Sequence, residues 1–386
     1  MINYFKNKIH YFIFFFILFT FYLIFEPRIT PDTRAYIATG ENLINFILKG
    51  NINEFLNTLL QIDVLFKIIS ILNISIFFQL IGENAKYILV IINLILYFYI
   101  FNLNCTISKK LNPLNNNRYL FLIIIFFSFF YIPVFLLTFN VLTEIYFQCI
   151  CILYLKQLYF ENYKLKKLFL LAILSLLINP MGIVLIGFTS MIAISKYSKL
   201  NIYFLILSAL FLIIFAVPFI LDYSFKASYF SSIESGRIKY LEKGNIIYFF
   251  LYYEQGALRW CENYCDFGNI YQSLKSNSNY LDYLISGFLR IYYFIYPVRP
   301  YFSLIHNILI SICMIFIYGG FFLSFMNHKF KNYLPFYFIL FFVSFFVITP
   351  LTPNYRYQSV FYLMLIPNSA IFYNILLIKF YEKYFN

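Results

Sequence analysis

The chain has 386 residues, of which 62% are hydrophobic and 12% are charged, and its mean hydropathy is +0.77. Apolar runs of about 17–23 residues recur along it and match the hydrocarbon thickness of a bilayer, which excludes a soluble globular protein. The net charge of +13 comes from 29 Lys and Arg residues against 16 Asp and Glu residues. In a membrane protein such an excess belongs to the cytoplasmic loops, so we expect no nucleic-acid partner.

The apolar runs predict an all-α fold, namely a polytopic transmembrane helical bundle of about ten spans that forms one integral membrane domain over residues 1–386. The first run is not followed by a small-residue cleavage site, so it predicts a retained span rather than a signal peptide. Two short spans meet at Asn179-Pro180, where we expect a sharp turn or a broken helix. In chain order the predicted spans are 9–25, 85–103, 118–138, 143–160, 165–179, 180–196, 200–221, 303–325, 333–349 and 357–378.

The short basic loops predict the orientation of these spans. With the N-terminus in the cytoplasm, the Lys-rich or Arg-rich loops 104–118, 161–167, 196–199 and 326–332 all face the cytoplasm, as the positive-inside rule requires. The segment 62–81 is also apolar, but a crossing there would turn the later basic loops outward. We therefore expect it to be a helix that lies in the outer interface.

Residues 26–84 form the first of two large outer regions. Two helix-like runs, 32–49 and 53–72, have apolar residues three or four positions apart, which is typical of amphipathic helices that lie on a bilayer surface. Asp32 starts the first run. It is either a helix N-cap or a reactive carboxylate at the membrane boundary, and the sequence leaves both interpretations open.

Residues 222–302 form the second outer region, which is either a lid over an anionic ligand or a structural cap. Cys261 and Cys265 lie in it and form either a local disulfide or two free thiols. Its basic residues include Arg237, Lys239, Arg259, Lys275, Arg290 and Arg299.

Four polar residues from separate parts of the chain fall at the outer leaflet in this topology: Asp32, Glu144, Asn179 and Arg356. Glu144 is either a helix-start acid favoured by the helix dipole or part of a reaction centre. Arg356 is either a snorkelling anchor or a phosphate ligand, because a guanidinium group matches phosphate oxygens. Two acids and an arginine suit a reaction in which a carboxylate activates an acceptor and a cation holds a departing phosphate.

Other site chemistries find less support in the sequence. It has no glycine-rich phosphate loop, which argues against a nucleotide-driven enzyme. Asp32 and Glu144 could hold a hard divalent cation through their oxygens. The sequence does not decide whether such a metal cofactor is present.

The motifs Pro31-Asp32-Thr33-x-x-Tyr36, Thr143-Glu144, Asn179-Pro180 and Arg356-Tyr357, together with the interfacial helix pair, resemble the GT-C superfamily of membrane glycosyltransferases. The bacterial branch related to protein mannosyltransferases and aminoarabinose transferase is the most similar. Many of these enzymes have Arg-Pro where this chain has Asn179-Pro180. Some branches carry paired acids in the first outer loop, where this chain has a single acid at position 32 in place of the pair.

The resemblance implies a glycosyltransferase in the bacterial cytoplasmic membrane, with its active site facing the periplasm or exterior. The donor would be a polyprenyl-phosphate sugar, and the acceptor a lipid, glycan or protein. Asp32 and Glu144 would be catalytic, and Arg356, Tyr357 and Asn179 would bind the donor phosphate. The alternatives are a polysaccharide polymerase, which would depend on the basic outer-loop residues, and a flippase or transporter of lipid-linked oligosaccharides.

Overall fold

The computed structural model describes residues 9–114, 116–130, 135–159, 164–202, 204, 205, 208, 304–324, 337 and 355–385. In these ranges the chain is helical and has no strand, and one isolated parallel β-bridge joins Arg28 to Asn140, so the all-α prediction is confirmed. The chain divides into two compact units. The helices that carry the candidate site belong to the first, which comprises Met1–Ala193, Cys313–Leu334 and Asn354–Asn386.

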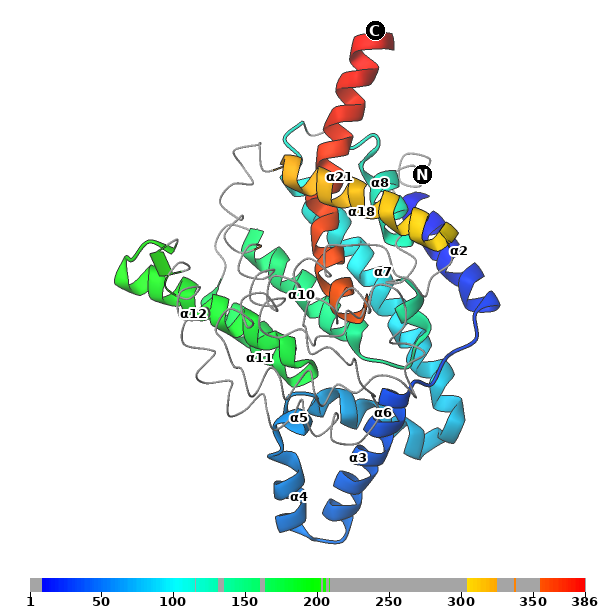
Figure 1. The fold of residues 1–386 in the computed structure, drawn as a ribbon, viewed down its shortest axis with the longest axis vertical. Helices are drawn as coiled ribbons and strands as arrows, with labels where there is room; N and C mark the ends of the chain where they lie inside the picture. The colour runs from blue at the N-terminus through cyan, green and yellow to red at the C-terminus, as the bar shows by residue number, and fades with distance from the viewer. Residues whose placement is uncertain are drawn as a thin grey trace, which may run out of the picture. The chain divides into compact units, whose positions relative to one another are not determined.

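Helices lie at the predicted spans in the described ranges, but several bounds differ (Figure 1). The helices at the predicted spans 85–103 and 357–378 continue to Leu111 and Phe385, and the predicted span 118–138 contains a helix over Leu120–Phe130 and a 3-10 turn at its end. Four of them form the centre of the first unit, where α10 packs against α7, α11 and α21. The predicted spans 200–221 and 333–349 lie largely outside the described residues. The helices are α2 (Ile9–Ile24), α3 (Pro31–Leu48), α4 (Ile52–Leu59), α5 (Ile62–Leu65), α6 (Ile68–Ile81), α7 (Ala85–Leu111), α8 (Leu120–Phe130), α10 (Glu144–Tyr159), α11 (Leu165–Ile178), α12 (Ile183–Ser198), α18 (Leu304–Ser324) and α21 (Tyr355–Phe385), with short 3-10 turns at Gly82–Asn84, Leu137–Phe139 and Pro180–Gly182.

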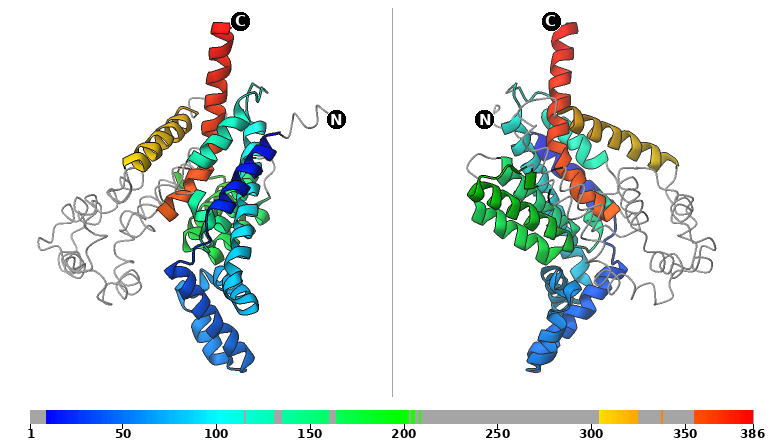
Figure 2. Two further views of the ribbon diagram at one scale, coloured as in Figure 1. Left: turned by 90° about the vertical axis from the view of Figure 1, so that its right-hand side faces the viewer. Right: turned by 60° about the vertical axis from the view of Figure 1, so that its left-hand side comes forward.

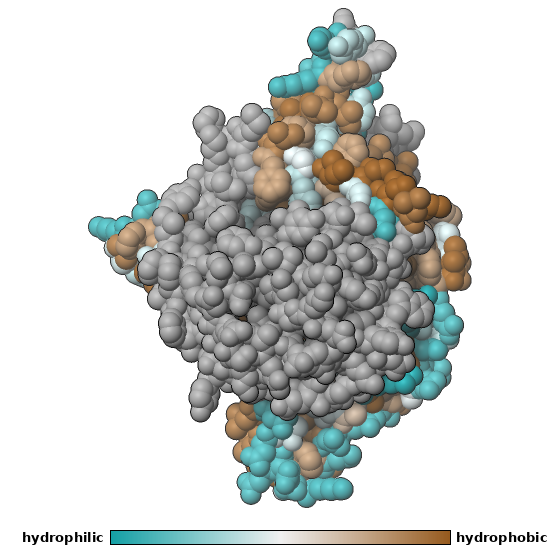
Figure 3. Space-filling model, in the orientation of Figure 1, coloured by the Kyte–Doolittle hydropathy of each residue, from teal (hydrophilic) through white to brown (hydrophobic). Residues whose placement is uncertain are grey.

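The length and hydropathy of several helices indicate a membrane protein. Three stretches of the described chain are long and apolar enough to cross a bilayer: Ile68–Leu111, Asn307–Ser324 and Tyr362–Tyr384. α2, α12 and most of α8 are shorter apolar helices. Figure 3 shows hydrophilic residues over the α3–α4 hairpin and over the C-terminal end of α21, and hydrophobic residues over α2 and α18. The number of crossings and their orientation stay predictions.

The first outer region folds as a helical hairpin on a small core of its own. Leu43 of α3, Val64 of α5 and Ile71 of α6 are buried together, and Tyr36 and Phe55 pack against them. The prediction of one helix-like run over 53–72 is wrong, because the chain leaves the helix after α4 and again before α6. Two breaks let the chain fold back, so that α6 lies against α3. Both views of Figure 2 show the α3–α4 hairpin projecting from the lower end of the first unit.

α6 and α7 are separate helices, although their apolar character is continuous. Gly82 ends α6 with φ at 61°, a left-handed conformation that glycine adopts without steric cost, and a 3-10 turn leads into α7. In Figure 1, α6 runs across the lower end of the bundle and α7 rises from its far end. This direction agrees with an interfacial α6, which stays a prediction.

The break predicted at Asn179-Pro180 is confirmed. α11 ends at Ile178, the chain makes a 3-10 turn over Pro180–Gly182, and α12 begins at Ile183. The turn folds tightly on α11, because a Cβ atom at Gly182 would overlap the backbone of Ser175 and Leu176. Only glycine fits this approach.

A proline in α21 explains a buried amide in α7. Pro367 has no N–H group, so the carbonyl of Leu363 one turn earlier loses its helical partner. The Asn104 side chain of α7 donates to that carbonyl at 3.4 Å, and Ser108 donates to the Pro367 carbonyl at 3.5 Å. Both α7 side chains are fully buried, so they supply donors where water has no access.

Small residues let α18 approach α21. A Cβ atom at Gly320 would come within 3.1 Å of the Ser369 backbone, and the Ser369 hydroxyl donates to the Ile317 carbonyl at 2.6 Å. Close approach through small residues, with a hydrogen bond across the interface, is typical of helices that pack within membranes.

We expect Gly182→Ala to lower stability by about 1–3 kcal/mol, because the added methyl group would push the turn away from α11. Thermal unfolding in a mild detergent measures this. Gly187→Ala in α12 is the matched control, because a Cβ atom there meets nothing within 4 Å. Equal loss in both proteins would contradict the packing described for Gly182.

Asn104 and Pro367 should be coupled energetically. Asn104→Leu should cost about 1–3 kcal/mol, because it leaves the Leu363 carbonyl buried without a donor. In a Pro367→Leu background the new N–H can bond this carbonyl, so the same Asn104 substitution should cost clearly less. A double-mutant cycle of unfolding midpoints tests this, and additive effects would rule the coupling out.

Candidate functional site

The segment that follows α2 is held on the segment that precedes α10. Arg28 N–H donates to the Phe139 carbonyl at 2.9 Å, and Val141 N–H donates to the Arg28 carbonyl at 2.9 Å. These two bonds form the isolated β-bridge between Arg28 and Asn140. Regions more than a hundred residues apart in the chain therefore meet immediately before the first turns of α3 and α10.

The first turn of α3 completes this junction. Thr30 is the N-cap and forms a capping box with Thr33, whose hydroxyl also donates to the Val141 carbonyl at 2.6 Å. The interpretation of Asp32 as the N-cap is therefore wrong: Thr30 holds that position, and the half-buried Asp32 lies in the first turn. Its carboxylate there is favoured by the helix dipole.

Asn93 of α7 holds the other side of the same segment. Its amide group is fully buried and lies within donor distance of three backbone carbonyls, those of Thr138 at 3.4 Å, Asn140 at 3.0 Å and Leu142 at 3.4 Å. Because all three are acceptors, the NH₂ group must face them. This stretch has the 3-10 turn Leu137–Phe139 in place of an α-helical ladder, and Asn93 and Thr33 supply further donors that keep it ordered.

Glu144 begins α10, three residues after Val141. It is 7% exposed, and Gln148, one turn further on, is 0% exposed. Residues four apart share one face of a helix, so both polar side chains are inside the bundle on the same side of α10. The position confirms a helix-start acid, and its burial goes beyond what the dipole needs.

Asn179 lies in the turn between α11 and α12. Its side-chain oxygen accepts from Met181 N–H at 3.0 Å, which stabilises the turn. α6 connects this turn to α10, because Ser70 donates to the Ile178 carbonyl at 3.1 Å and Asn73 donates to the Tyr146 hydroxyl at 3.0 Å.

Arg356 and Tyr357 lie in the first turn of α21. The Tyr159 hydroxyl of α10 donates to Asn368 of α21 at 3.0 Å, which fixes how the two packed helices align. In Figure 1, α21 rises from its first turn and α10 passes beside it obliquely.

The five predicted site residues come from four elements of the first unit. The segments of Asp32 and Glu144 are joined by hydrogen bonds, and α6 links Asn179 to α10. These hydrogen bonds do not reach the first turn of α21, with Arg356 and Tyr357. The predicted pair Cys261 and Cys265 and the basic residues of 222–302 lie outside the described residues.

A bound metal ion needs several ligand side chains close together. Within the described ranges, no three His, Cys, Asp or Glu side chains gather as a metal would need. Asp32 and Glu144 supply two carboxylates, and a hard cation takes six or more oxygen ligands. A divalent cation as cofactor stays a hypothesis.

Sequence reasoning missed the residues that hold the site. Asn93 and Gln148 each carried a signal, because each is an amide in an otherwise apolar helical run. Thr33 carried a weaker one, the Thr-x-x-Thr spacing of a capping box. None of these signals names the partner segment.

Comparisons of the chain with protein-family models, with curated proteins and with solved structures found no match. The likeness to the GT-C superfamily therefore stays a resemblance carried by short motifs.

We expect Asn93→Asp to destabilise the protein by at least about 2 kcal/mol, because a carboxylate would face three carbonyl oxygens instead of donating to them. Thermal unfolding in detergent measures the loss. Asn102→Asp is the control: the Asn102 oxygen accepts from the Tyr11 hydroxyl, and a carboxylate can accept the same bond. Equal stability of the Asn93→Asp and Asn102→Asp proteins would refute this role for Asn93.

Proposed function

We propose that the protein is a membrane glycosyltransferase that moves a sugar from a polyprenyl-phosphate donor to an acceptor at the outer face of the cytoplasmic membrane. The main support is the junction that brings the Asp32 segment next to the start of α10, where Glu144 is buried. The motif resemblance to the GT-C superfamily supports the same reaction. The acceptor would be a lipid, a glycan or a protein.

In the proposed reaction Asp32 takes the proton of the acceptor hydroxyl. The hydroxyl oxygen then bonds to the anomeric carbon, while the bond from that carbon to the phosphate oxygen breaks and polyprenyl phosphate leaves with the electron pair. Displacement at the opposite face inverts the anomeric centre. Glu144 assists the base or binds a cation.

Arg356 would hold the leaving phosphate, because its planar guanidinium group can donate two hydrogen bonds to phosphate oxygens. Tyr357 and Asn179 would add neutral donors. The Asn179 oxygen is engaged in its turn, so its NH₂ group is the part that could reach a phosphate.

The buried polar side chains of α7 bear on the transporter alternative, because polar side chains at mid-bilayer often line substrate paths. Asn104 and Ser108 instead bond backbone carbonyls of α21 around Pro367. Their structural task accounts for their burial, so they give no specific support to a flippase.

We expect Asp32→Asn to reduce sugar transfer at least a hundredfold, because loss of a general base typically costs about 10²–10⁴ in rate. Glu144→Gln should reduce it as well. The assay follows release of polyprenyl phosphate and labelling of acceptor in membranes given a polyprenyl-phosphate sugar. Glu41→Gln, an exposed change in the same helix α3, is the control and should leave transfer intact.

All three proteins must first show wild-type insertion and unfolding midpoints. Transfer that persists in a stable Asp32→Asn protein would remove Asp32 from the mechanism. Activity confined to polymerisation of a lipid-pyrophosphate substrate would favour the polymerase alternative.

A further inference from the structure

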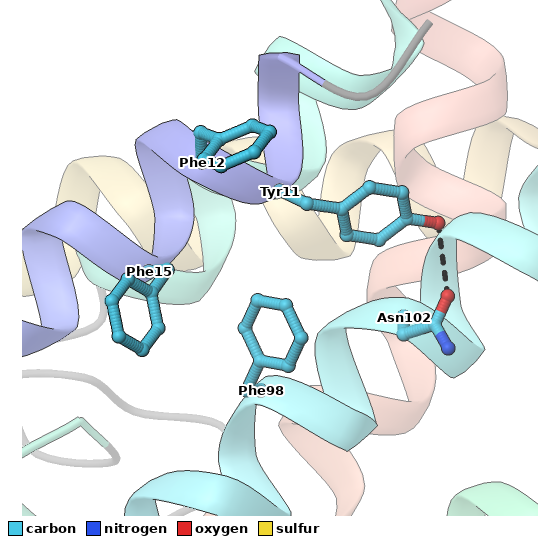
Figure 4. A pocket seen from close by; sticks show the side chains of 5 residues that line it. All are labelled: Tyr11, Phe12, Phe15, Phe98 and Asn102. Atoms are coloured by element: carbon cyan, nitrogen blue, oxygen red, sulfur yellow. Dashed lines mark hydrogen bonds between the residues drawn. The ribbon is translucent and has the colours of Figure 1, made fainter. Parts of the chain in front are cut away.

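A groove of about 610 Å³ lies between α2 and α7, away from the candidate site. Its walls are Tyr11, Phe12 and Phe15 of α2 and Phe98 and Asn102 of α7 (Figure 4). Phe12 and Phe15 are 59% and 58% exposed, although both belong to an apolar helix. Rings that stay exposed on an apolar helix face lipid, so a lipid chain is the solute with direct access to this groove.

One end of the groove is polar. The Tyr11 hydroxyl donates to the Asn102 side-chain oxygen at 2.9 Å, as Figure 4 shows. Tyrosine and asparagine are unusual on a lipid-facing surface unless a polar group lies nearby. The hydrogen-bonded pair Tyr11 and Asn102 therefore indicates which end of the groove suits the polar part of a bound lipid.

A lysine, Lys109, lies on the same face of α7 as the groove residues Phe98 and Asn102. Phe98, Asn102, Thr106 and Lys109 are spaced by four, four and three residues, so they share one helix face. Thr106 and Lys109 are exposed. Lys109 therefore lies about two helical turns beyond Asn102, on the side of the polar end of the groove.

We propose that this groove binds an anionic glycerophospholipid of the leaflet at the basic end of α7. Its acyl chain lies against Phe12, Phe15 and Phe98, and its phosphate pairs with Lys109. Charge complementarity favours an anionic headgroup, because basic residues between helices at this boundary attract acidic lipids. This site is independent of the glycosyltransferase proposal.

Lipid quenching of tryptophan fluorescence tests the site directly. The single tryptophan of the chain, Trp260, is replaced by Trp260→Phe, and Phe98→Trp then puts the reporter in the groove. The full chain is reconstituted in phosphatidylcholine with brominated phosphatidylglycerol or brominated phosphatidylcholine of the same chain length. We expect the groove to prefer phosphatidylglycerol about fivefold, the effect of one lysine near a headgroup of net negative charge, because phosphatidylcholine carries the same phosphate but is neutral overall.

Three controls make the result specific. Adding Lys109→Gln should abolish the preference, whereas Lys379→Gln, the same change at an exposed lysine near the end of α21, should preserve it. Ile91→Trp, also lipid-exposed on α7, should report no preference. Equal quenching by both lipids in the Phe98→Trp protein would mean annular lipid only, and a preference that survives Lys109→Gln would also overturn the proposal.

Discussion

The first unit depends on hydrogen bonds to the backbone N–H and C=O groups that are buried in its apolar interior. The stretch that leads into α10 leaves helical geometry while still buried, and each unpaired N–H or C=O group there would cost several kcal/mol. Arg28 supplies backbone pairing from one side, and Asn93 and Thr33 supply side-chain donors. The same contacts that make this stretch stable bring the first turns of α3 and α10 together.

α7 meets this requirement along its length. Asn93, Tyr97, Asn104 and Ser108 are all buried on it, and each donates to a carbonyl of another segment. The segments reached are the stretch before α10, α8 at Ser128, and α21 around Pro367. A proline in one helix and an amide in another are thus complementary parts of one arrangement, so neither can be interpreted alone.

Periodicity and turn chemistry made most helices predictable. The apolar runs predicted α2, α7, α10, α11 and α18, and Asn179-Pro180 predicted the break after α11, because these signals are local. The Asp32 cap was wrong for a local reason too: Thr30 and Thr33 cap each other, and Pro31 fits the first helical position. Asn93 could be noticed as a lone amide, but its three partners lie 45–49 residues further along the chain. Tertiary pairing of that kind has no local signature.

The two acids of the proposed site, Asp32 and Glu144, differ in how deeply they are buried. A carboxylate at a helix start gains about 0.3–1 kcal/mol from the dipole, and an exposed one gains it without desolvation. Glu144 is 7% exposed, so its carboxyl group gives up most of its hydration at the same kind of position. Asp32 is half-buried, so its carboxyl group keeps part of its hydration. Burial, together with Gln148 one turn further on the same face of α10, therefore makes Glu144 the more distinctive of the two acids in the proposed active site.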